Sequence, residues 1–528
     1  MRINSTLITR RKFQLKHIAM LVCLLFTSTL LLVSCNLEED PPFLDVSLYN
    51  KPQEAEAARD GIYAALTQYN AQEQRMFVEN GFSGLMVTRR GGNKLTSVWM
   101  NNVMKLNPNE NVDTQNTWIG LYRLISRSNA VISNSLYDAS STDADQIRIN
   151  DVVGHAYFTR AWAHFSLTRL WADIPVWLTV ANESDVHRAK TSSKEVYQQV
   201  IDDATQAIAL LNGSAGIGFP KAHASRMMLA KVYMLLATNP SLQADGMSEM
   251  DYWNMAYQQA KAVYDSGDYS LVSDYATLFD GSNENSTESI FELQLAQDAC
   301  NSQMGRNYTP WRYKNGNAFG WFLVSADVYD HHAAHYPADP RLDATYLSDY
   351  TQKCSGCDTE GNPVRTYPTN SGRNAFGNAH PYLFKHAEKD TNHTNQCNSQ
   401  NLIVYRYADL ILMLSEISNE LQNGEALGYV TEVLARAGQT PHAGYTGDQA
   451  SFRDAIMDEY RFELLGEGLD SYNNRRRGYT YFLNNTIKRH NNNPSFKASV
   501  DVLLNDVESE VMYLDMPLLE INNNNLID

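Results

Sequence analysis

Residues 157–176 read YFTRAWAHFSLTRLWADIPV, and this stretch decides the fold class. Phe158, Trp162, Phe165 and Arg169 stand at i, i+4, i+7 and i+11, which places them on one face of an α-helix. Pro175 cannot continue a helix, so we expect the helix to end there. The stretch predicts a long helix that buries an aromatic face against other helices.

The same spacing recurs on both sides of this stretch. It predicts further helices through the apolar stripes Val200/Ala204/Ala207/Leu211, Met228/Val232/Leu235, Ala256/Ala260/Val263, Leu410/Leu414/Ile417/Leu421 and Leu427/Val430/Leu434/Ala437. Alanines on these faces let paired helices approach closely, which is typical of tetratricopeptide-like hairpins. No strict repeat of about 34 residues is visible in the sequence. We predict a mainly all-α protein with a tetratricopeptide-like helix-pair scaffold.

The pattern changes between about residues 268 and 400. Helical periodicity fades there, and Gly, Asn, Pro and aromatic residues become frequent. A long stretch without periodicity inside a compact protein is usually a functional loop region. We predict a helical scaffold over residues 49–267 and 401–480, and an irregular, loop-rich ligand-binding region over residues 268–400.

The N-terminus has the pattern of an export signal. Five basic residues and no acidic ones precede an apolar run over residues 18–33, which closes on Leu32-Val33-Ser34-Cys35. This resembles a bacterial lipobox, in which Cys35 is lipidated and becomes the first mature residue. A transmembrane anchor is the alternative, but the run is shorter than the roughly 20 residues that span a bilayer. We predict a lipoprotein signal peptide over residues 1–34 and an acidic tether over residues 35–48.

The charge of the chain excludes some partners. The net charge is −17, and loss of the five basic residues of the signal takes it to −22. Such a charge disfavours nucleic acid and anionic membrane surfaces. We therefore expect no nucleic-acid partner, and membrane attachment through palmitate-type lipid on Cys35.

Four cysteines remain beyond the signal and Cys35, namely Cys300, Cys354, Cys357 and Cys397. Disulfides are permitted outside the inner membrane. A local bond between Cys354 and Cys357 is the simplest expectation, although the pairing among the four stays open. Zinc would need two further ligands, such as Cys397 and His393. We predict neither a metal nor a cofactor.

Seven segments, taken in order, resemble the SusD/RagB family of outer-membrane nutrient-binding lipoproteins. They are residues 118–132 (WIGLYRLISRSNAVI), 157–176, 222–236 (AHASRMMLAKVYMLL), 338–342 (ADPRL), 406–420 (RYADLILMLSEISNE), 459–468 (EYRFELLGEG) and 516–521 (MPLLEI). The sequence departs from the family pattern at Tyr460, Leu469-Asp470 and Asn473-Asn474. These are expected to be structural ion-pair positions, for which Arg475, Arg476 and Arg477 could compensate.

The resemblance implies a function as well as a fold. It implies four tetratricopeptide-like helix pairs and a SusC-like TonB-dependent outer-membrane transporter as partner, over which such a chain acts as a lid. It also implies a location in the outer membrane, facing the cell exterior, and a protein that is not an enzyme. Carbohydrate uptake is the expected role, and peptide uptake of the RagB kind is the alternative.

Sugars bind through flat aromatic faces, with amides and charged groups reading the hydroxyls. Aromatic residues in irregular segments are therefore the candidates for ligand binding, whereas Trp118, Trp162, Trp171 and Trp253 belong to helix stripes and are expected in the core. We predict that ligand is bound by Trp99, Asn101, Trp311, Arg312, Tyr313 and Trp321. The alternative for each is that it fills a small satellite core.

Two other kinds of chemistry are weighed against binding. His331, His332 and His335 follow Asp327, but the sequence lacks the glutamate that the zincin pattern requires. We therefore expect a solvated helix end without metal. A glycoside hydrolase would need two carboxylates about 5–10 Å apart, which a sequence cannot show, and it stays a remote alternative. We predict no catalytic residues. A pure interaction scaffold is a third possibility, compatible with ligand binding in the loops.

Overall fold

The computed structural model describes residues 49–68, 71–88, 112–135, 141–181, 186–310, 312–313, 318–351, 364–366, 380–389, 397, 399–494 and 503–527. The predicted signal peptide, the tether with Cys35, three of the predicted ligand-binding residues (Trp99, Asn101 and Trp311), and Cys354, Cys357 and His393 lie outside these ranges. In the described residues, no helix combines the length and the apolar character that crossing a membrane requires.

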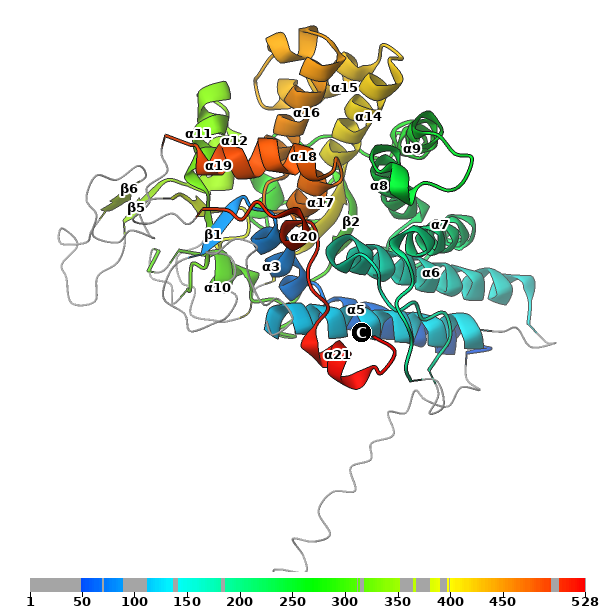
Figure 1. Cartoon of the computed structure of the whole chain (residues 1–528). Helices are drawn as coiled ribbons and strands as arrows, with labels where there is room; N and C mark the ends of the chain where they lie inside the picture. The colour runs from blue at the N-terminus through cyan, green and yellow to red at the C-terminus, as the bar shows by residue number, and fades with distance from the viewer. Residues whose placement is uncertain are drawn as a thin grey trace, which may run out of the picture. The chain divides into compact units, whose positions relative to one another are not determined.

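Four helix pairs follow one another along the described chain (Figure 1). They are α2 (Pro52–Leu66) with α5 (Val112–Asn134), α6 (Asp143–Trp171) with α7 (Ser193–Leu210), α8 (Ala222–Thr238) with α9 (Glu249–Tyr264), and α14 (Tyr407–Leu421) with α15 (Ala426–Arg436). Neighbouring pairs also touch, because α5 packs on α6, α7 on α8 and α9 on α14. The prediction of a mainly helical, tetratricopeptide-like scaffold is confirmed.

Helix α6 shows why these residues form a helix of this length. The Thr142 side chain accepts a hydrogen bond from the backbone of Asp145, whose carboxylate bonds back to Thr142, so a capping box starts the helix. Its aromatic face is buried as predicted. The helix ends at Trp171, before Pro175, because Ala172 adopts a left-handed φ of 58°. A Cβ at Gly154 would lie 3.0 Å from Leu210, so a small residue is needed where α6 meets α7.

The segment between α9 and α14 contains short elements. Its strands β3 (Phe322–Val324), β7 (Tyr382–Leu383) and β4 (Tyr346–Leu347) form one sheet with β1 (Met86–Thr88), which precedes α5 in the chain, in the order β1-β3-β7-β4. Two further ribbons pair β2 (Ser289–Leu293) with β8 (Leu402–Arg406), and β5 (Asp349–Thr351) with β6 (Val364–Thr366). Because β8 leads directly into α14, the β2–β8 ribbon joins this segment to the helical scaffold.

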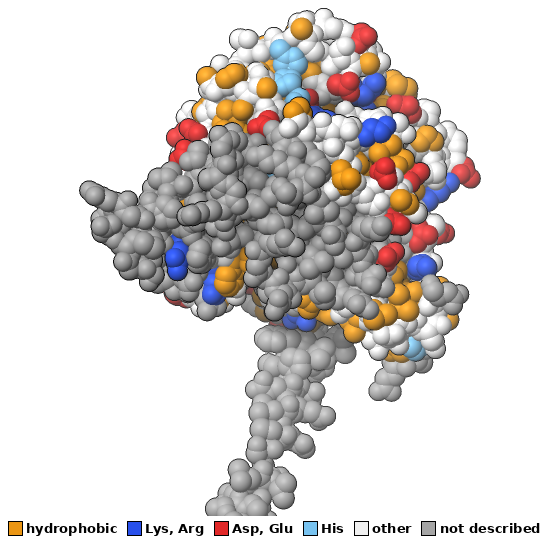
Figure 2. All heavy atoms as spheres, turned by 60° about the vertical axis from the view of Figure 1, so that its left-hand side comes forward, with side chains coloured by type: hydrophobic (Ala, Val, Ile, Leu, Met, Phe, Trp, Pro, Cys, Tyr) orange, Lys and Arg blue, Asp and Glu red, His pale blue; other side chains and the backbone are white. Residues whose placement is uncertain are grey.

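The remaining elements are short or lie near the C-terminus. They are α3 (Glu73–Phe82), η2 (Pro240–Leu242), η3 (Tyr275–Phe279), α10 (Met304–Tyr308), α11 (Ala326–His335), α12 (Arg341–Thr345), η4 (Ala443–Thr446), α16 (Gln449–Leu464), α17 (Asp470–Arg475), α18 (Tyr479–Phe482), η5 (Leu483–Ile487), α19 (Lys488–Asn491), α20 (Glu508–Val511) and α21 (Leu518–Asn523). On the face shown in Figure 2, acidic and basic side chains are interspersed and histidines gather at one end.

One large hydrophobic core runs through the helix pairs and extends under the short strands. The four tryptophans expected in the core, Trp118, Trp162, Trp171 and Trp253, are all at most 4% exposed. Their indoles contribute buried area to the scaffold and present no face to a ligand. This part of the aromatic prediction is confirmed.

Three of the sequence motifs meet in a buried group of charges, which we call the charge network. Arg341 lies 2.6 Å from Asp339, 2.6 Å from Glu459 and 2.8 Å from Glu463. Arg406 lies 2.6 Å from the other oxygen of Glu463. Burial alone would raise the pKa of Glu463, but the nearby arginines, Arg341 and Arg406 among them, hold it well below its usual value. The motifs are therefore joined by ion pairs that water does not screen.

The charge network extends from Arg406, the last residue of β8, to Glu288, the residue before β2, and to Glu467. Arg406 also lies 2.7 Å from Glu288 and 2.7 Å from Glu467. Lys385 is fully buried and lies 2.7 Å from Glu467. The network thus ties Arg341 and Lys385, two described residues between α9 and α14, to α16 and to Glu467, which follows it.

Candidate functional site

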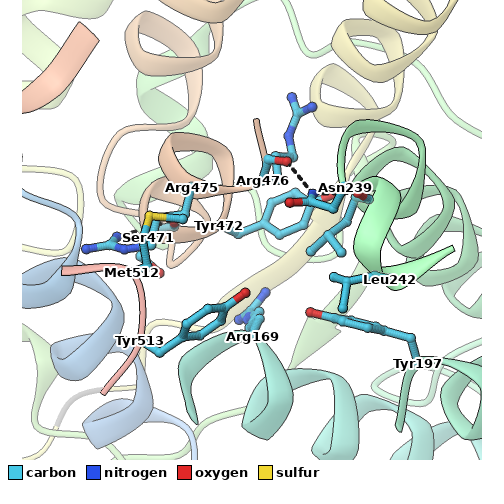
Figure 3. Close-up of a pocket in the computed structure, with 11 residues that line it drawn as sticks. Arg169, Tyr197, Asn239, Leu242, Ser471, Tyr472, Arg475, Arg476, Met512 and Tyr513 are labelled. Atoms are coloured by element: carbon cyan, nitrogen blue, oxygen red, sulfur yellow. Dashed lines mark hydrogen bonds between the residues drawn. The ribbon is translucent and has the colours of Figure 1, made fainter. Parts of the chain in front are cut away.

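A small cavity lies between α6, α7, α17 and the residues Met512 and Tyr513 (Figure 3). The side chains of Tyr197 and Tyr513 converge on Arg169 there. Its volume of about 30 Å³ holds one or two water molecules at most. This cavity is too small for a sugar ring.

A larger depression of about 310 Å³ lies between the loop before α8 and the strand β2. Its aromatic wall is already covered, because the Arg59 guanidinium lies 4.3 Å from the centre of the Phe219 ring. Its carboxylate is also engaged, since Glu292 accepts hydrogen bonds from the Asn285 backbone and the Asn401 side chain at 3.1 and 2.9 Å. Sequence reasoning did not single out this depression, because its walls come from segments far apart in the chain.

The predicted residue Trp321 lies in a pair of stacked rings. The rings of Phe319 and Trp321 are 5.0 Å apart and inclined by only 6°. Both side chains are half-buried, so part of each ring reaches the surface. We call these two residues the aromatic ledge. Arg306 covers Phe319 at 4.1 Å, and Phe77 contacts Trp321 edge-on at 6.0 Å. Phe319 was not among the predicted site residues.

The backbone explains how two residues separated by one can stack. In an extended chain, residues at i and i+2 share one face but stand well apart. Gly320 between them has a φ of +55°, which turns the chain so that the rings come together. The backbone N–H groups of Phe319 and Trp321 donate to the carbonyls of Arg306 and Asn307, each at 2.8 Å. The ledge is therefore fixed to α10.

Helix α10 is in turn held by α3. The Glu73 carboxylate accepts hydrogen bonds from the Gln303 backbone at 2.7 Å and from the Asn307 side chain at 2.8 Å. Burial raises the pKa of Glu73 to about 7, although these hydrogen bonds oppose the rise. The Asn80 amide donates to the Tyr308 hydroxyl at 2.8 Å. Polar residues buried on α3 thus position the base of the ledge.

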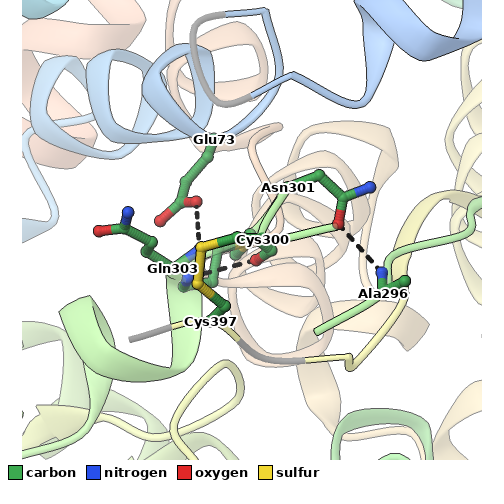
Figure 4. Close-up of a disulfide and its surroundings, with 8 residues drawn as sticks. Glu73, Ala296, Cys300, Asn301, Gln303 and Cys397 are labelled. Atoms are coloured by element: carbon green, nitrogen blue, oxygen red, sulfur yellow. Dashed lines mark hydrogen bonds between the residues drawn. A yellow bond between two sulfur atoms is a disulfide. The ribbon is translucent and has the colours of Figure 1, made fainter. Parts of the chain in front are cut away.

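A disulfide fixes the same place from the other side (Figure 4). Cys300 is bonded to Cys397, 97 residues later, and it lies beside the contact between Glu73 and Gln303. This bond settles a pairing that the sequence left open. The suggestion that Cys397 could bind zinc is wrong, because its sulfur is used in the disulfide.

The predicted residue Tyr313 lies in a different cluster from the ledge. Tyr313 packs against Tyr350 and Phe384 with ring centres 6.0 and 5.7 Å away. It belongs to a small cluster with Leu323, on the other side of strand β3 from the main core. Burial raises the pKa of Tyr313. This placement favours the alternative in which Tyr313 fills a small satellite core. Among the predicted residues that the structure describes, Trp321 is the one that stacks on another ring.

The three histidines of α11 do not form a solvated helix end. His332 is fully buried, lies 3.1 Å from Asp339 and stacks on Phe462 at 4.3 Å. Burial lowers the pKa of His332 to about 4, although Asp339 opposes the drop. The expectation was wrong for this residue because the sequence did not show that α16 covers one side of α11. His331 and His335 lie nearer the surface.

Comparison with known proteins places the chain in a family. A family described as "Starch-binding associating with outer membrane" matches residues 42–234, and the family described as "SusD family" matches residues 264–527. The chain belongs to the SusD/RagB family. It is 24% identical to SusD-like protein P25 of Formosa agariphila over 489 residues, which are 86% of this chain and 88% of the relative.

Solved SusD-like structures share the fold of this SusD/RagB-family chain. A laminarin-binding SusD-like protein is 19% identical and superposes with a TM-score of 0.66 over 91% of this chain and 99% of its own. A protein crystallised with xylogluco-oligosaccharide is 20% identical, with a TM-score of 0.67 over 89% of this chain and 97% of its own. At these identities the likeness shows the fold alone.

The departures from the SusD/RagB pattern lie in the buried interior. Arg476 forms two hydrogen bonds with Glu416 at 2.7 and 2.5 Å, and Arg477 contacts the same carboxylate. The guanidinium of Arg476 also lies 5.5 Å from the ring of Tyr460, one of the departing residues. The pKa of Glu416 falls to about 2, because these two arginines outweigh the effect of burial. Arg476 and Arg477 therefore form structural ion pairs here.

Proposed function

We propose that this chain is a cell-surface lipoprotein that binds oligosaccharide and delivers it to a SusC-like TonB-dependent transporter. The aromatic ledge is the observation that carries the proposal. It offers the half-buried ring of Trp321, backed by the parallel ring of Phe319, on a base held by hydrogen bonds and a disulfide. Flat rings of this kind pack well against the CH-rich faces of sugars.

Rigidity is what makes the ledge suited to binding. Ordering a mobile side chain on binding costs about 0.5–1.5 kcal/mol, and a preformed surface avoids that cost. Trp321 and Phe319 are already ordered by each other, by Arg306 and by Phe77. Ligand can therefore gain the stacking energy without first immobilising the rings.

The relatives favour a glycan over a peptide as the ligand. The similar structures include a laminarin-binding protein and one crystallised with xylogluco-oligosaccharide. The protein acts without chemistry, as a binding protein that holds its ligand and transfers it. Trp99, Asn101 and Trp311 complete the proposed site together with the ledge.

Calorimetry with a panel of glycans and peptides tests the ligand class. The panel includes laminarin oligosaccharides, xylogluco-oligosaccharides and unstructured peptides. Binding of at least one glycan supports the proposal, whereas binding of peptides alone would overturn it in favour of peptide uptake.

Replacement of Trp321 by alanine tests the site. The substitution removes one ring of the ledge, so we expect glycan affinity to fall by at least about ten-fold, or about 1.4 kcal/mol. Trp177→Ala is the matched control, because Trp177 is also half-buried and is covered by Arg188 at 4.2 Å. Equal affinity of the Trp321 and Trp177 variants would move the site away from the ledge.

Attachment and partnership are tested separately. Cys35→Ala should abolish labelling with palmitate, since that cysteine is the proposed lipid acceptor. The full-length protein should co-purify from outer membranes with a TonB-dependent transporter. Continued labelling would remove the lipid anchor from the proposal, and purification without any transporter would remove the lid role.

A further inference from the structure

Two histidines and an aspartate from different helices come together at the surface. His331 and His335 stand one helical turn apart on α11, and Asp458 projects from α16. One potential ligand atom from each lies within 4.8 Å of the others. The Nε2 atom of His331 is 2.8 Å from Oδ2 of Asp458, and the two imidazole rings are 4.2 Å apart.

These separations are close to those of a metal site. Zn–N and Zn–O bonds of about 2.0–2.2 Å at tetrahedral angles place ligand atoms about 3.3 Å apart. The atoms here need to move by at most about 1.5 Å from their present positions to reach that spacing. Because Phe462 of α16 contacts His331 at 5.6 Å and His335 at 5.7 Å, the two histidines of α11 are already held beside α16.

The hydrogen bonds around the three side chains show which atoms could bind an ion. The Nε2 atom of His331 donates to Oδ2 of Asp458 at 2.8 Å, so an ion would take the place of that proton, which would move to Nδ1 of His331. The Nδ1 atom of His335 lies 3.1 Å from the carbonyl oxygen of His331, to which it can only donate. This fixes the proton on Nδ1 and leaves Nε2 of His335 as an acceptor, the arrangement that supports metal-binding histidines. Arg489 binds Oδ1 of Asp458 at 2.9 Å and so directs Oδ2 towards His331.

A neighbouring histidine is excluded by the same reasoning. The ring of His442 lies 5.6 Å from that of His335. Its Nδ1 atom accepts a hydrogen bond from the Gly444 backbone at 3.0 Å, which leaves the proton on Nε2. His442 therefore has no free lone pair to offer, and a fourth coordination position would be open to water.

We propose that His331, His335 and Asp458 bind one divalent transition-metal ion of the zinc type. Two imidazoles and one carboxylate suit such an ion better than Ca²⁺ or Mg²⁺, which prefer oxygen ligands. The positive charge of Arg489 opposes the ion, so the affinity is moderate. The ion would link α11, which directly follows the strand β3, to α16 of the C-terminal half.

Titration of the mature protein, without a histidine tag, tests this site. Calorimetry with Zn²⁺ should show one ion bound per chain, and Co²⁺ should give the visible absorption of a tetrahedral complex. His331→Ala and His335→Ala should each weaken binding by at least about ten-fold. His335 is the safer variant because its side chain is exposed and its loss leaves the helix packing intact.

Two control variants separate the site from general histidine binding. His442→Asn keeps an acceptor for the Gly444 backbone, and His223→Ala removes a histidine that faces only one carboxylate, that of Asp268, at 3.5 Å. Both should bind Zn²⁺ within about two-fold of the unaltered protein. Absence of saturable one-to-one binding, or equal loss in His442→Asn and His335→Ala, would overturn the proposal.

Discussion

Replacing Arg341 by methionine removes one cation from the charge network while filling most of its space. Asp339 would still have His332 at 3.1 Å, and Glu463 would still have Arg406 at 2.6 Å. Glu459 loses its ion pair, and of its hydrogen bonds in the described structure it would keep only that from the Tyr445 hydroxyl at 3.5 Å. Glu459 is therefore the group that decides how much stability Arg341→Met loses.

The cost can be worked out from the protonation of Glu459. Burial raises the pKa of Glu459 even with Arg341 present, because desolvation outweighs the arginine. Without the arginine the carboxyl takes up a proton, which for an ordinary glutamate of pKa 4.5 costs about 3 kcal/mol at pH 7. Breaking one side of a buried ion pair usually costs about 3–5 kcal/mol, in agreement with this figure. The loss is a large share of a total stability of about 5–15 kcal/mol.

The pH dependence distinguishes this mechanism from a simple packing defect. When a carboxyl has a higher pKa in the folded than in the unfolded state, the protein loses stability as the pH rises above the unfolded pKa. The stability cost of Arg341→Met should therefore shrink at lower pH. Between pH 7 and pH 5.5 the stability gap to the unaltered protein should narrow by up to about 2 kcal/mol, because the raised pKa of Glu459 in the unaltered protein takes up part of the difference. Urea unfolding followed by circular dichroism at both pH values measures the gap.

A surface pair provides the control for Arg341→Met. Arg148 lies 2.8 Å from Glu56, but these side chains are 40% and 29% exposed. Arg148→Met should therefore cost less than about 1 kcal/mol at either pH. If Arg341→Met costs less than about 1.5 kcal/mol at pH 7, or the same at both pH values, the reasoning from an orphaned carboxyl is refuted.

Three further predictions concern the base of the ledge. Because burial raises the pKa of Glu73 from 4.5 to about 7, its ionisation costs stability as the pH rises through that window, and Glu73→Gln should remove up to about 3 kcal/mol of that pH dependence in urea unfolding; parallel pH profiles of the two proteins would contradict this. The Cys300–Cys397 bond closes a loop of 97 residues, so the double serine variant should unfold up to about 4–5 kcal/mol more easily and lose the corresponding part of its response to reductant, which thermal unfolding with and without dithiothreitol measures. Gly320→Ala should cost about 1–2 kcal/mol of stability and weaken glycan binding in calorimetry. Gly267 has a φ of +69° and open space around an added Cβ, so Gly267→Ala should cost a similar amount of stability without affecting binding.

The helices could be predicted from the sequence because burial repeats with the helical period. The stripe of α6 identified its core face, but the start of the helix at Thr142 was missed. The spacing of Thr142 and Asp145 is a capping-box signal that could have found it. The end was placed too late, at Pro175, because nothing in the sequence marks the left-handed conformation of Ala172.

The site could be predicted only in kind. Aromatic residues in an irregular segment were chosen as candidates, and Trp321 was named for that reason; its contact with ligand stays a prediction. That Phe319 stacks on Trp321 depends on the backbone conformation of Gly320, which composition cannot reveal. The charges of the family-like motifs were visible, yet Arg341 and Glu459 are 118 residues apart, and only the fold brings them together.

The charge network and the ledge are separate structures, and this separation has a consequence for variants. Arg341 contacts carboxylates on α16, whereas Trp321 contacts Phe319 and Phe77. Substitutions without shared partners have nearly additive effects. Arg341→Met should therefore lower stability while leaving the glycan affinity of the folded protein unchanged, and Trp321→Ala should lower affinity far more than stability. Under the proposed function, in which a lipid anchor keeps the protein beside a transporter, a modest ligand affinity is enough, so the interior has to supply stability rather than contacts to the ligand.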